Sequence, residues 1–183
     1  MTAAAASLDP RTTLARPDLA EQALEGIVRA SAFRAVRAMH CAVPVADIHI
    51  DVIAGEHPVD QLIFGEAFDV LDTRGDQVWG RARRDGVVGW VMQSALRDGA
   101  PLATHRIGTT GESLPLNALV VEVGDPAGLA PIGSFAAEPV EVAERLLGTP
   151  YKLGGRSSLG TDCCGLVQQA LYACGRAAPR YAD

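Results

Sequence analysis

Two adjacent cysteines, Cys163 and Cys164, are the residues best suited to chemistry in this 183-residue sequence. They follow Thr161 and Asp162, whose side-chain oxygens can accept the free backbone N–H groups at the start of a helix. A thiol on the first turn of a helix lies at the positive end of the helix dipole, which favours the nucleophilic thiolate form. The pattern therefore predicts a nucleophilic cysteine at a capped helix start.

The helix that carries these cysteines is predicted to have one apolar side. Apolar residues recur there at steps of three and four, which is the period of a helix face. They are Leu166, Val167, Ala170, Leu171 and Cys174. Gly175 follows, and glycine tolerates the left-handed backbone that often ends a helix. Upstream, Gly154 and Gly155 predict a loop whose backbone turns close to the cysteines.

Two further helices are expected. Glu138 and Pro139 open one of them, because proline suits the first helical position. Its predicted apolar stripe is Val140, Ala143 and Leu147, and Gly148 ends it. The other runs from Leu19 to about Arg29, with Asp18 and Glu21 as its cap and Leu24, Ile27 and Val28 as its apolar side. Residues 1–17, before that helix, are expected to form an arm that wraps the protein.

Short strands separated by turns are expected from residue 33 to residue 96, a spacing typical of a small barrel. The predicted strands are Met39–Val45, Ile48–Ile53 and a strand–turn–strand unit over Gln61–Asp72. Turns are predicted at Gly55–Pro58, Gly75–Asp76 and Asp85–Gly86, the last being a strong hairpin signal. Further along, Leu116–Val123 reads as a strand and Gly124–Gly128 as a turn.

The composition narrows the class of protein. Hydrophobic residues make up 48% and charged residues 21%, as expected of a packed protein. The net charge is −6 without a Lys/Arg cluster, so nucleic acid is not an expected partner. No apolar run has the length of a membrane span, and the cysteine spacing fits no zinc site. Residues 1–7 lack the pattern of a secretory signal, so a cytoplasmic protein is expected.

The cysteine segment resembles the NlpC/P60 family of cysteine peptidases, whose pattern is Pro-Tyr-x-Trp-Gly-Gly followed by Asp-Cys-Ser-Gly-Leu-Val-Gln. The matching positions are Pro150, Tyr151, Gly154, Gly155, Asp162, Cys163, Gly165, Leu166, Val167 and Gln168. Leu153 replaces the tryptophan of the pattern, and Cys164 replaces its serine. The resemblance covers the chain from about Glu138 to its last residue. The run from Leu62 to Leu96 resembles a bacterial SH3-like domain, which commonly precedes this peptidase domain.

The resemblance implies an α+β protein: a small SH3-like β-barrel followed by the N-terminal part of a papain-like NlpC/P60 domain. The expected parts are an arm and helix (1–32), the SH3-like domain (33–100), a degenerate second SH3-like segment or linker (101–136), and the N-terminal portion of the peptidase domain (137–183). The implied reaction is hydrolysis of γ-D-glutamyl–diamino acid bonds in peptidoglycan-derived peptides, with no cofactor or metal. It would serve recycling of imported wall peptides or turnover of the wall. Neither nucleic acid nor membrane is implied as a partner.

The same resemblance assigns the site. Cys163 matches the nucleophile, and Tyr151, Asp162 and Cys164 are the expected substrate-binding residues. For two of these residues a purely structural role is the alternative to substrate binding: Asp162 could serve only as a helix cap, and the Tyr151 ring could simply pack against its neighbours. Cys41 and Cys174 are expected to be ordinary buried cysteines. In the SH3-like domain, Glu66 and Trp79 lie at plausible loop or edge positions for selecting a substrate, while Trp79 and Trp90 also fit barrel core or rim positions.

The family's catalytic base is a histidine well downstream of the cysteine. The four histidines here are His40, His49, His57 and His105, and all precede Cys163, so ordinary surface or strand roles are expected for them. We therefore expect the 183-residue chain alone to be inactive, and its cysteine helix to lack its usual cover and to favour self-association. The alternative is a non-catalytic SH3-like binding module that carries a dead peptidase remnant.

Overall fold

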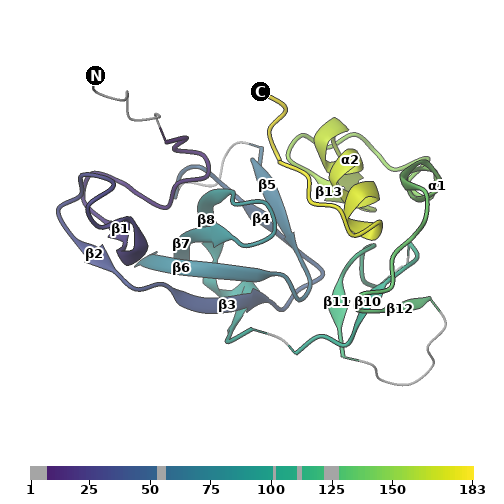
Figure 1. Cartoon of the computed structure of the whole chain (residues 1–183), viewed down its shortest axis with the longest axis horizontal. Coiled ribbons are helices and arrows are strands. Elements are labelled where there is room, and N and C mark those ends of the chain that lie inside the picture. Colours follow the sequence, from purple (N-terminus) through teal and green to yellow (C-terminus); the bar gives the residue numbers. More distant parts are fainter. Residues whose placement is uncertain (1–7, 53–56, 101, 111–112, 122–127) are drawn as a thin grey trace.

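The computed structural model describes residues 8–52, 57–100, 102–110, 113–121 and 128–183 (Figure 1). Its helices are α1 (Pro139–Glu144), α2 (Cys163–Ala173) and the 3₁₀ turns η1 (Gln22–Leu24) and η2 (Gln93–Ala95). Its strands are β1 (Ala20–Glu21), β2 (Phe33–Arg34), β3 (Arg37–Cys41), β4 (Val45–Ile48), β5 (Asp60–Ile63), β6 (Ala67–Arg74), β7 (Gln77–Ala82), β8 (Val88–Met92), β9 (Leu96–Asp98), β10 (His105–Ile107), β11 (Leu119–Val120), β12 (Leu129–Pro131), β13 (Arg156–Ser157) and β14 (Gly160–Thr161).

The largest sheet is antiparallel and has the strand order β8-β7-β6-β3-β9. A second pair, β4 and β5, lies against it, and a backbone bridge between His49 and Trp90 ties the end of β4 to β8. The two predicted hairpin turns are confirmed: β6 turns into β7 at Gly75, and β7 turns into β8 at Gly86, both with positive φ. The sequence therefore identified the central meander of this domain.

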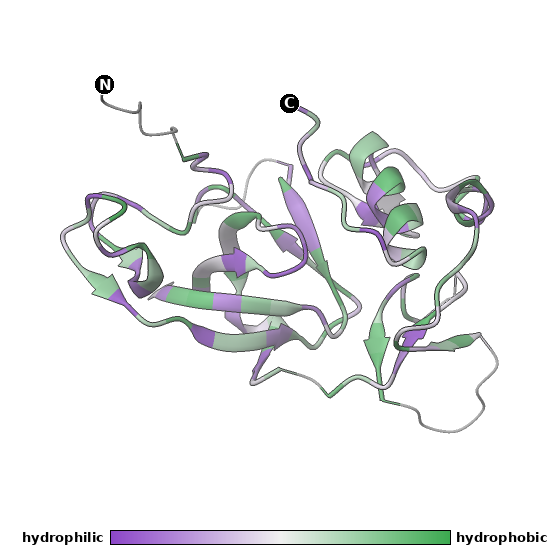
Figure 2. Ribbon diagram, viewed as in Figure 1, coloured by the Kyte–Doolittle hydropathy of each residue, from purple (hydrophilic) through white to green (hydrophobic). Residues whose placement is uncertain are grey.

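The sheet separates two apolar clusters because successive strand residues point to opposite faces. On β7, Val78 faces the inner core and Trp79 faces outward; on β8, Val91 and Trp90 do the same. The inner core contains Met39, Cys41, Ala46, Ile48, Leu62, Phe68, Val70, Val78, Ala82, Val87, Val91, Ala95 and Leu96. Figure 2 shows apolar residues (green) and polar residues (purple) interspersed along these strands.

The outer face of the sheet is covered by the N-terminal arm. Leu14 and Leu19 pack there with Leu71 and the two tryptophans, and the Arg16 guanidinium lies 4.2 Å from the ring centroid of Trp79. The expectation of a wrapping arm is thus confirmed for its described part, from residue 8 onward. The tryptophans lie beneath this arm, where they are nearly buried, and Trp79 does not present a free loop or edge to a substrate.

The expectation of a helix from Leu19 to Arg29 is wrong. The segment is extended at β1, makes one 3₁₀ turn, and then passes through Gly26 with a φ of 80°. β1 pairs in parallel with β2, and Glu21 forms an ion pair with Arg81 of the sheet. Ile27, predicted on the apolar side, is exposed. Contacts of β1 with the barrel therefore outweigh the weak helical pattern.

Several strand limits also differ from the expectation. β3 ends at Cys41 instead of continuing to Val45, and β4 ends at Ile48, where a strand was expected to begin. The unit over Gln61–Asp72 is confirmed as β5, a turn and β6. β11 is only two residues long. The first residues of the turn predicted at Gly55–Pro58, most of the turn at Gly124–Gly128 and the end of the strand at Leu116–Val123 lie outside the described residues.

The C-terminal half packs around α2. A small sheet of order β11-β10-β12 holds the end of this helix, where Arg106 donates to the carbonyl of Ala173. Helix α1 crosses α2 through one apolar cluster, which contains Leu116, Val142, Leu146, Ala170 and Ala173. In the part of the chain that the structure describes, no helix is long and apolar enough to cross a membrane.

Both predicted apolar helix faces needed correction. On α1, Val140 and Leu147 are exposed, whereas Ala143 packs against the cluster as predicted, and Val142 and Leu146 are the residues that are buried there. On α2, Val167 is 54% exposed, whereas the polar residues Gln168 and Gln169 are buried.

The inner side of α2 is covered within the chain, contrary to the expectation of an uncovered helix. Ala170 and Ala173 pack against α1 and Leu116, and Leu166 and Cys174 are partly buried against the same cluster. Self-association through α2 stays a prediction, and the exposed Val167 is an apolar side chain that such a contact could use.

Candidate functional site

Cys163 occupies the first position of α2, as the sequence predicted. Asp162 is the N-cap, and its Oδ1 accepts from the backbone N–H of Gly165 at 2.8 Å. The helix ends before Gly175, whose φ is 72°. Cys163 is exposed and Cys164 is half-buried, with their Sγ atoms 3.9 Å apart. The local sequence therefore places a solvent-accessible thiol at the positive end of the helix.

The glycine-rich loop before α2 folds into the short hairpin of β13 and β14. Gly154 has a φ of 78° and lies directly against the backbone oxygen of Pro58, so a Cβ atom would overlap that oxygen. Gly165, on the first turn of α2, leaves equally little room beside the backbone of Gly155. Glycine at these positions lets the loop, the helix and the SH3-like domain meet next to Cys163.

Replacing Gly154 with alanine is expected to destabilise the protein more than the same change at Gly26. Both residues have a φ near 80°, but the space around Gly26 is open. Gly26→Ala should therefore cost only the left-handed backbone, about 1 kcal/mol. Gly154→Ala adds overpacking, which typically costs a further 1–3 kcal/mol or so. Chemical denaturation of both variants measures the difference, and equal losses would contradict the close contact with Pro58.

A cavity of about 810 Å³ opens at the two cysteines. One wall comes from the SH3-like domain, and the other comes from the glycine loop, the start of α2 and the C-terminal segment. The lining residues are His57, Pro58, Val59, Tyr151, Leu153, Gly154, Asp162, Cys163, Cys164, Arg180, Tyr181 and Ala182. The structure thus brings all four residues expected at the site, Cys163, Tyr151, Asp162 and Cys164, to one cavity. It also adds His57 and Arg180, which the sequence did not single out.

Asp162 is held by more partners than a helix cap requires. Its Oδ1 accepts from Gly165 N and Arg180 Nη1, and its Oδ2 accepts from Gly154 N and Arg180 Nη2, at 2.5–2.9 Å. Burial by itself would raise the pKa of Asp162, but the hydrogen bonds from Arg180 and Gly165 and the charge of Arg180 bring that pKa below its ordinary value. With four acceptor sites occupied, the carboxylate positions the loop and the helix start. A contact with substrate stays a prediction.

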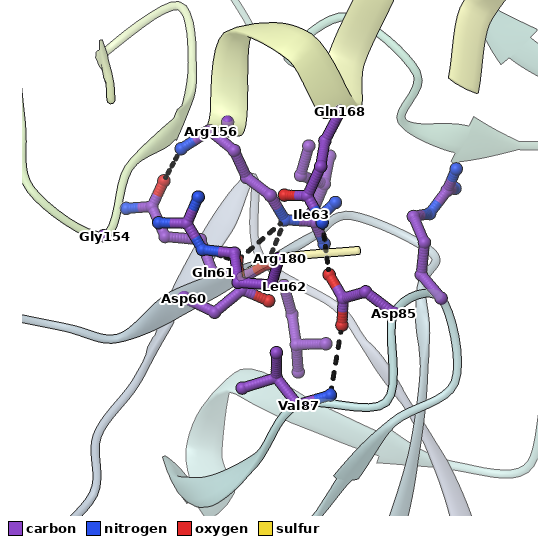
Figure 3. A network of polar contacts seen from close by, with 12 residues as sticks. Asp60, Gln61, Leu62, Ile63, Asp85, Val87, Gly154, Arg156, Gln168 and Arg180 are labelled. Atoms are coloured by element: carbon purple, nitrogen blue, oxygen red, sulfur yellow. Dashed lines mark hydrogen bonds and ion pairs between the residues drawn. The ribbon is translucent and has the colours of Figure 1, made fainter. Parts of the chain in front are cut away.

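Arg180 connects Asp162 to a buried network of charged and polar side chains, part of which is shown in Figure 3. Arg156 is fully buried, and it donates through Nε to the carbonyl of Gln61 at 2.6 Å and forms an ion pair with Glu66. Asp60 Oδ1 lies 3.3 Å from Arg156 Nε and 3.2 Å from Arg180 Nε. These contacts connect β5 of the SH3-like domain to the loop and the tail beside Cys163. The C-terminal segment runs between β5 and α2 (Figure 1).

Burial disfavours the charged form of every group in this network, so it shifts the pKa of Asp60 upward and that of Arg156 downward. Asp60 is completely buried and its carboxylate oxygens have no hydrogen-bond partner, so burial raises the pKa of Asp60 despite the nearby Arg156 charge. Burial alone would lower the pKa of Arg156, but the charges of Glu66 and Asp60 raise it. The nearby carboxyl groups therefore favour the cationic form of Arg156 in the interior.

Glu66 lies in the turn between β5 and β6, as suggested, but its side chain belongs to this buried network, and a role in selecting substrate stays a prediction. It is 2% exposed, accepts from the backbone N–H of Ile63, and pairs with Arg84 at 2.6 Å as well as with Arg156. Sequence reasoning missed Arg156 as a partner of Glu66, and it missed Asp60 and Arg180 as further members of the network. The available signal was polar residues that interrupt apolar or turn segments, such as Asp60 and Gln61 at the start of an otherwise apolar strand.

The remaining cysteines fit the structural roles expected of them. Cys41 is completely buried in the barrel core, where burial raises the pKa of its thiol to about 11. Cys174 is partly buried against the helix cluster at the far end of α2. Among the residues that the structure describes, no group of three or more His, Cys, Asp or Glu side chains could hold a metal ion.

The fold and the cavity define a two-part protein in which the domain of antiparallel strands β3 to β9 forms one wall of a cysteine-bearing site. Residues 55–96 match the family model of the bacterial dipeptidyl-peptidase Sh3 domain. The fold is similar over most of its length to the crystal structure of an NlpC/P60 family protein from Bacillus cereus ATCC 10987. That likeness has a TM-score of 0.60 and 15% sequence identity, and it covers 78% of this chain and 74% of the other. No curated protein matches significantly. Together these likenesses indicate an SH3-like domain joined to a fold like that of an NlpC/P60 family protein.

Proposed function

We propose that this protein is a cysteine peptidase that hydrolyses γ-D-glutamyl–diamino acid bonds in peptidoglycan-derived peptides, with Cys163 as its nucleophile. The observation that carries the proposal is the exposed Cys163 thiol on the first turn of α2, facing a cavity that the SH3-like domain closes on one side. The resemblance to NlpC/P60 peptidases supports the reaction and the substrate class.

The helix start supplies two of the groups that this reaction needs. The Cys163 thiolate would attack the scissile carbonyl and form an acyl-enzyme. Gly165 N–H is taken by Asp162, but the backbone N–H groups of Cys163 and Cys164 have no acceptor within the helix, so they can stabilise the oxyanion that develops. Asp162, fixed by Arg180, holds this helix start in place. Tyr151 lies at the mouth of the same cavity, 72% exposed, where its hydroxyl can reach a bound peptide.

The wall contributed by the SH3-like domain would limit the length of the substrate. Pro58 and Val59, just before β5, line the cavity, and the exposed His57 precedes them. Such a wall favours a short peptide with a free N-terminus over a peptide embedded in a large polymer. The proposed substrate is therefore a soluble wall fragment, and recycling of such fragments is the proposed role.

The test uses the full-length polypeptide encoded by the reading frame that contains these residues. It should release diaminopimelate-bearing product from L-Ala-γ-D-Glu-diaminopimelate peptides. Cys163→Ala should lower kcat by roughly 10³-fold or more, because the covalent step is lost. Cys174→Ala, at the buried end of the same helix, should retain the rate. Equal activity of the wild-type protein and Cys163→Ala would overturn the assignment, and faster release from intact sacculi than from free peptides would overturn the recycling role.

One observation favours the alternative of a non-catalytic binding module. Among the described residues, the hydrogen bond found for the Cys163 thiol involves Cys164, and no imidazole bonds to it. In that case the same peptides would bind in calorimetry with equal affinity for the wild-type protein and Cys163→Ala, and no product would form.

A further inference from the structure

The two adjacent thiols of the site form a chemical pair in their own right. The Sγ atoms of Cys163 and Cys164 lie 3.9 Å apart, and both residues line the cavity. The other two cysteines are remote from them: Cys41 is enclosed in the barrel core, and Cys174 is at the opposite end of α2. An oxidised Cys163 would therefore find Cys164 as its nearest thiol.

The two members of the pair differ in their surroundings. Cys163 is exposed at the helix start, where an oxidant can reach it. Cys164 is less exposed, and burial together with the neighbouring Cys163 sulfur raises the pKa of its thiol. Because oxidants react with the thiolate, the accessible Cys163 is the member expected to react first. Cys164 then remains as a protonated thiol in contact with it.

We propose that Cys163 and Cys164 are a site of reversible oxidation by peroxides. The Cys163 thiolate attacks a peroxide oxygen, the O–O bond breaks, and the departing hydroxide takes up a proton to become water. This step oxidises Cys163 to a sulfenic acid. The Cys164 sulfur then attacks the Cys163 sulfur, the S–O bond breaks, and the hydroxyl group leaves as water with the Cys164 proton. In sum, two thiols and one hydrogen peroxide give one disulfide and two water molecules.

The position of the pair at the helix start allows this bond to close. Consecutive Cα atoms are about 3.8 Å apart, which is shorter than the separation of most disulfides, so the link is strained. At the first turn, the backbone N–H groups of both cysteines have no acceptor within the helix. Rotation of the peptide between them therefore disturbs little more than the hydrogen bond accepted by the Cys163 carbonyl. A strained disulfide is also easily reduced, which makes the modification reversible.

Formation of the disulfide does not depend on peptidase activity, although its consequence rests on the proposed function. As a disulfide, Cys163 could not act as a nucleophile, and it would be protected from irreversible oxidation to sulfinic acid. The site would thus be switched off by peroxide and restored by a thiol reductant.

The experiment oxidises the 183-residue chain with a stoichiometric amount of hydrogen peroxide and measures the tryptic peptide that spans residues 157–176. A Cys174→Ala background is used because this peptide also contains Cys174. We expect the peptide to lose the mass of two hydrogen atoms and to regain it on treatment with glutathione. Adding Cys164→Ser should prevent the loss and raise dimedone labelling of Cys163 sulfenic acid by about 10-fold or more.

Other outcomes would overturn the proposal. These are equal dimedone labelling of Cys163 with and without the Cys164→Ser change, a disulfide to Cys41, or a dimer linked through Cys163. Thermal unfolding of each variant establishes that the fold is retained. A disulfide that forms in a protein without peptide hydrolysis would leave this proposal intact and remove the proposed function. Hydrolysis without disulfide formation would do the reverse.

Discussion

Replacing Arg156 with methionine is expected to lower the free energy of unfolding by about 3–5 kcal/mol, the usual cost of removing one partner from a buried ion pair. The substitution keeps an unbranched side chain in the cavity but removes the cation that faces Glu66 and Asp60. Both carboxylates are enclosed, and each would keep only its second arginine, Arg84 for Glu66 and Arg180 for Asp60. The loss also removes the hydrogen bond to the Gln61 carbonyl.

The matched control is Arg37→Met on β3. Arg37 pairs with Asp98 at 3.7 Å, and both side chains are more than half exposed. An exposed pair of this kind contributes about 0–1 kcal/mol, so the control should unfold nearly like the parent. Urea denaturation followed by circular dichroism compares the two variants. If Arg156→Met were no more destabilising than Arg37→Met, the buried network would not be the link between the barrel and the site.

Alkylation near neutral pH is expected to modify Cys163 at least about 100-fold faster than Cys41. The Cys163 thiol is exposed, whereas Cys41 is enclosed in the core and the pKa of its thiol is raised to about 11. At pH 7 such a thiol is ionised in about one molecule in 10⁴. The Cys41 sulfur also contacts the carbonyl of Val43 at 3.2 Å, which orients its proton inward. Cys41 should therefore resist the reagent until the barrel opens.

Peptide mapping of samples taken during iodoacetamide treatment gives the order of labelling. In denaturant, all four cysteines should react at similar rates, which provides the internal control. First labelling of Cys41, Cys164 or Cys174 in the folded protein would show that Cys163 is not the most reactive thiol, and the nucleophile would have to be reassigned.

The local features of the site could be predicted from the sequence because they depend on neighbouring residues. A cap followed by a periodic apolar run predicts where a helix starts, and Asp162 and α2 confirmed this. Adjacent glycine and aspartate residues between β-rich runs predicted the turns at Gly75 and Gly86 for the same reason. The expected α1 was also found, starting at Pro139. In each case the conformation is decided within a few residues.

The features that the sequence did not predict depend on partners far along the chain. Gln169 is buried on α2 because its amide donates to the carbonyl of Arg156 and accepts from Asn117. Arg180 lies 18 residues beyond Asp162, yet its guanidinium group donates two hydrogen bonds to that carboxylate. A hydrophobicity pattern assigns such residues to the surface, since it does not contain their partners. The wrong helix at Leu19–Arg29 has a similar origin, because pairing with β2 decided that segment.

The polar contact between β5 and the Cys163 loop limits how this protein could be recombined with others. Arg156 is supplied by one part of the chain, whereas Asp60, Gln61 and Glu66 are supplied by the other. A chimaera that exchanges the barrel for another SH3-like domain would bury Arg156 without its acceptors unless those three side chains were transplanted as well. The SH3-like domain and the Cys163 segment should therefore be exchanged together, because the partners of Arg156 in one part have to match the arginine in the other.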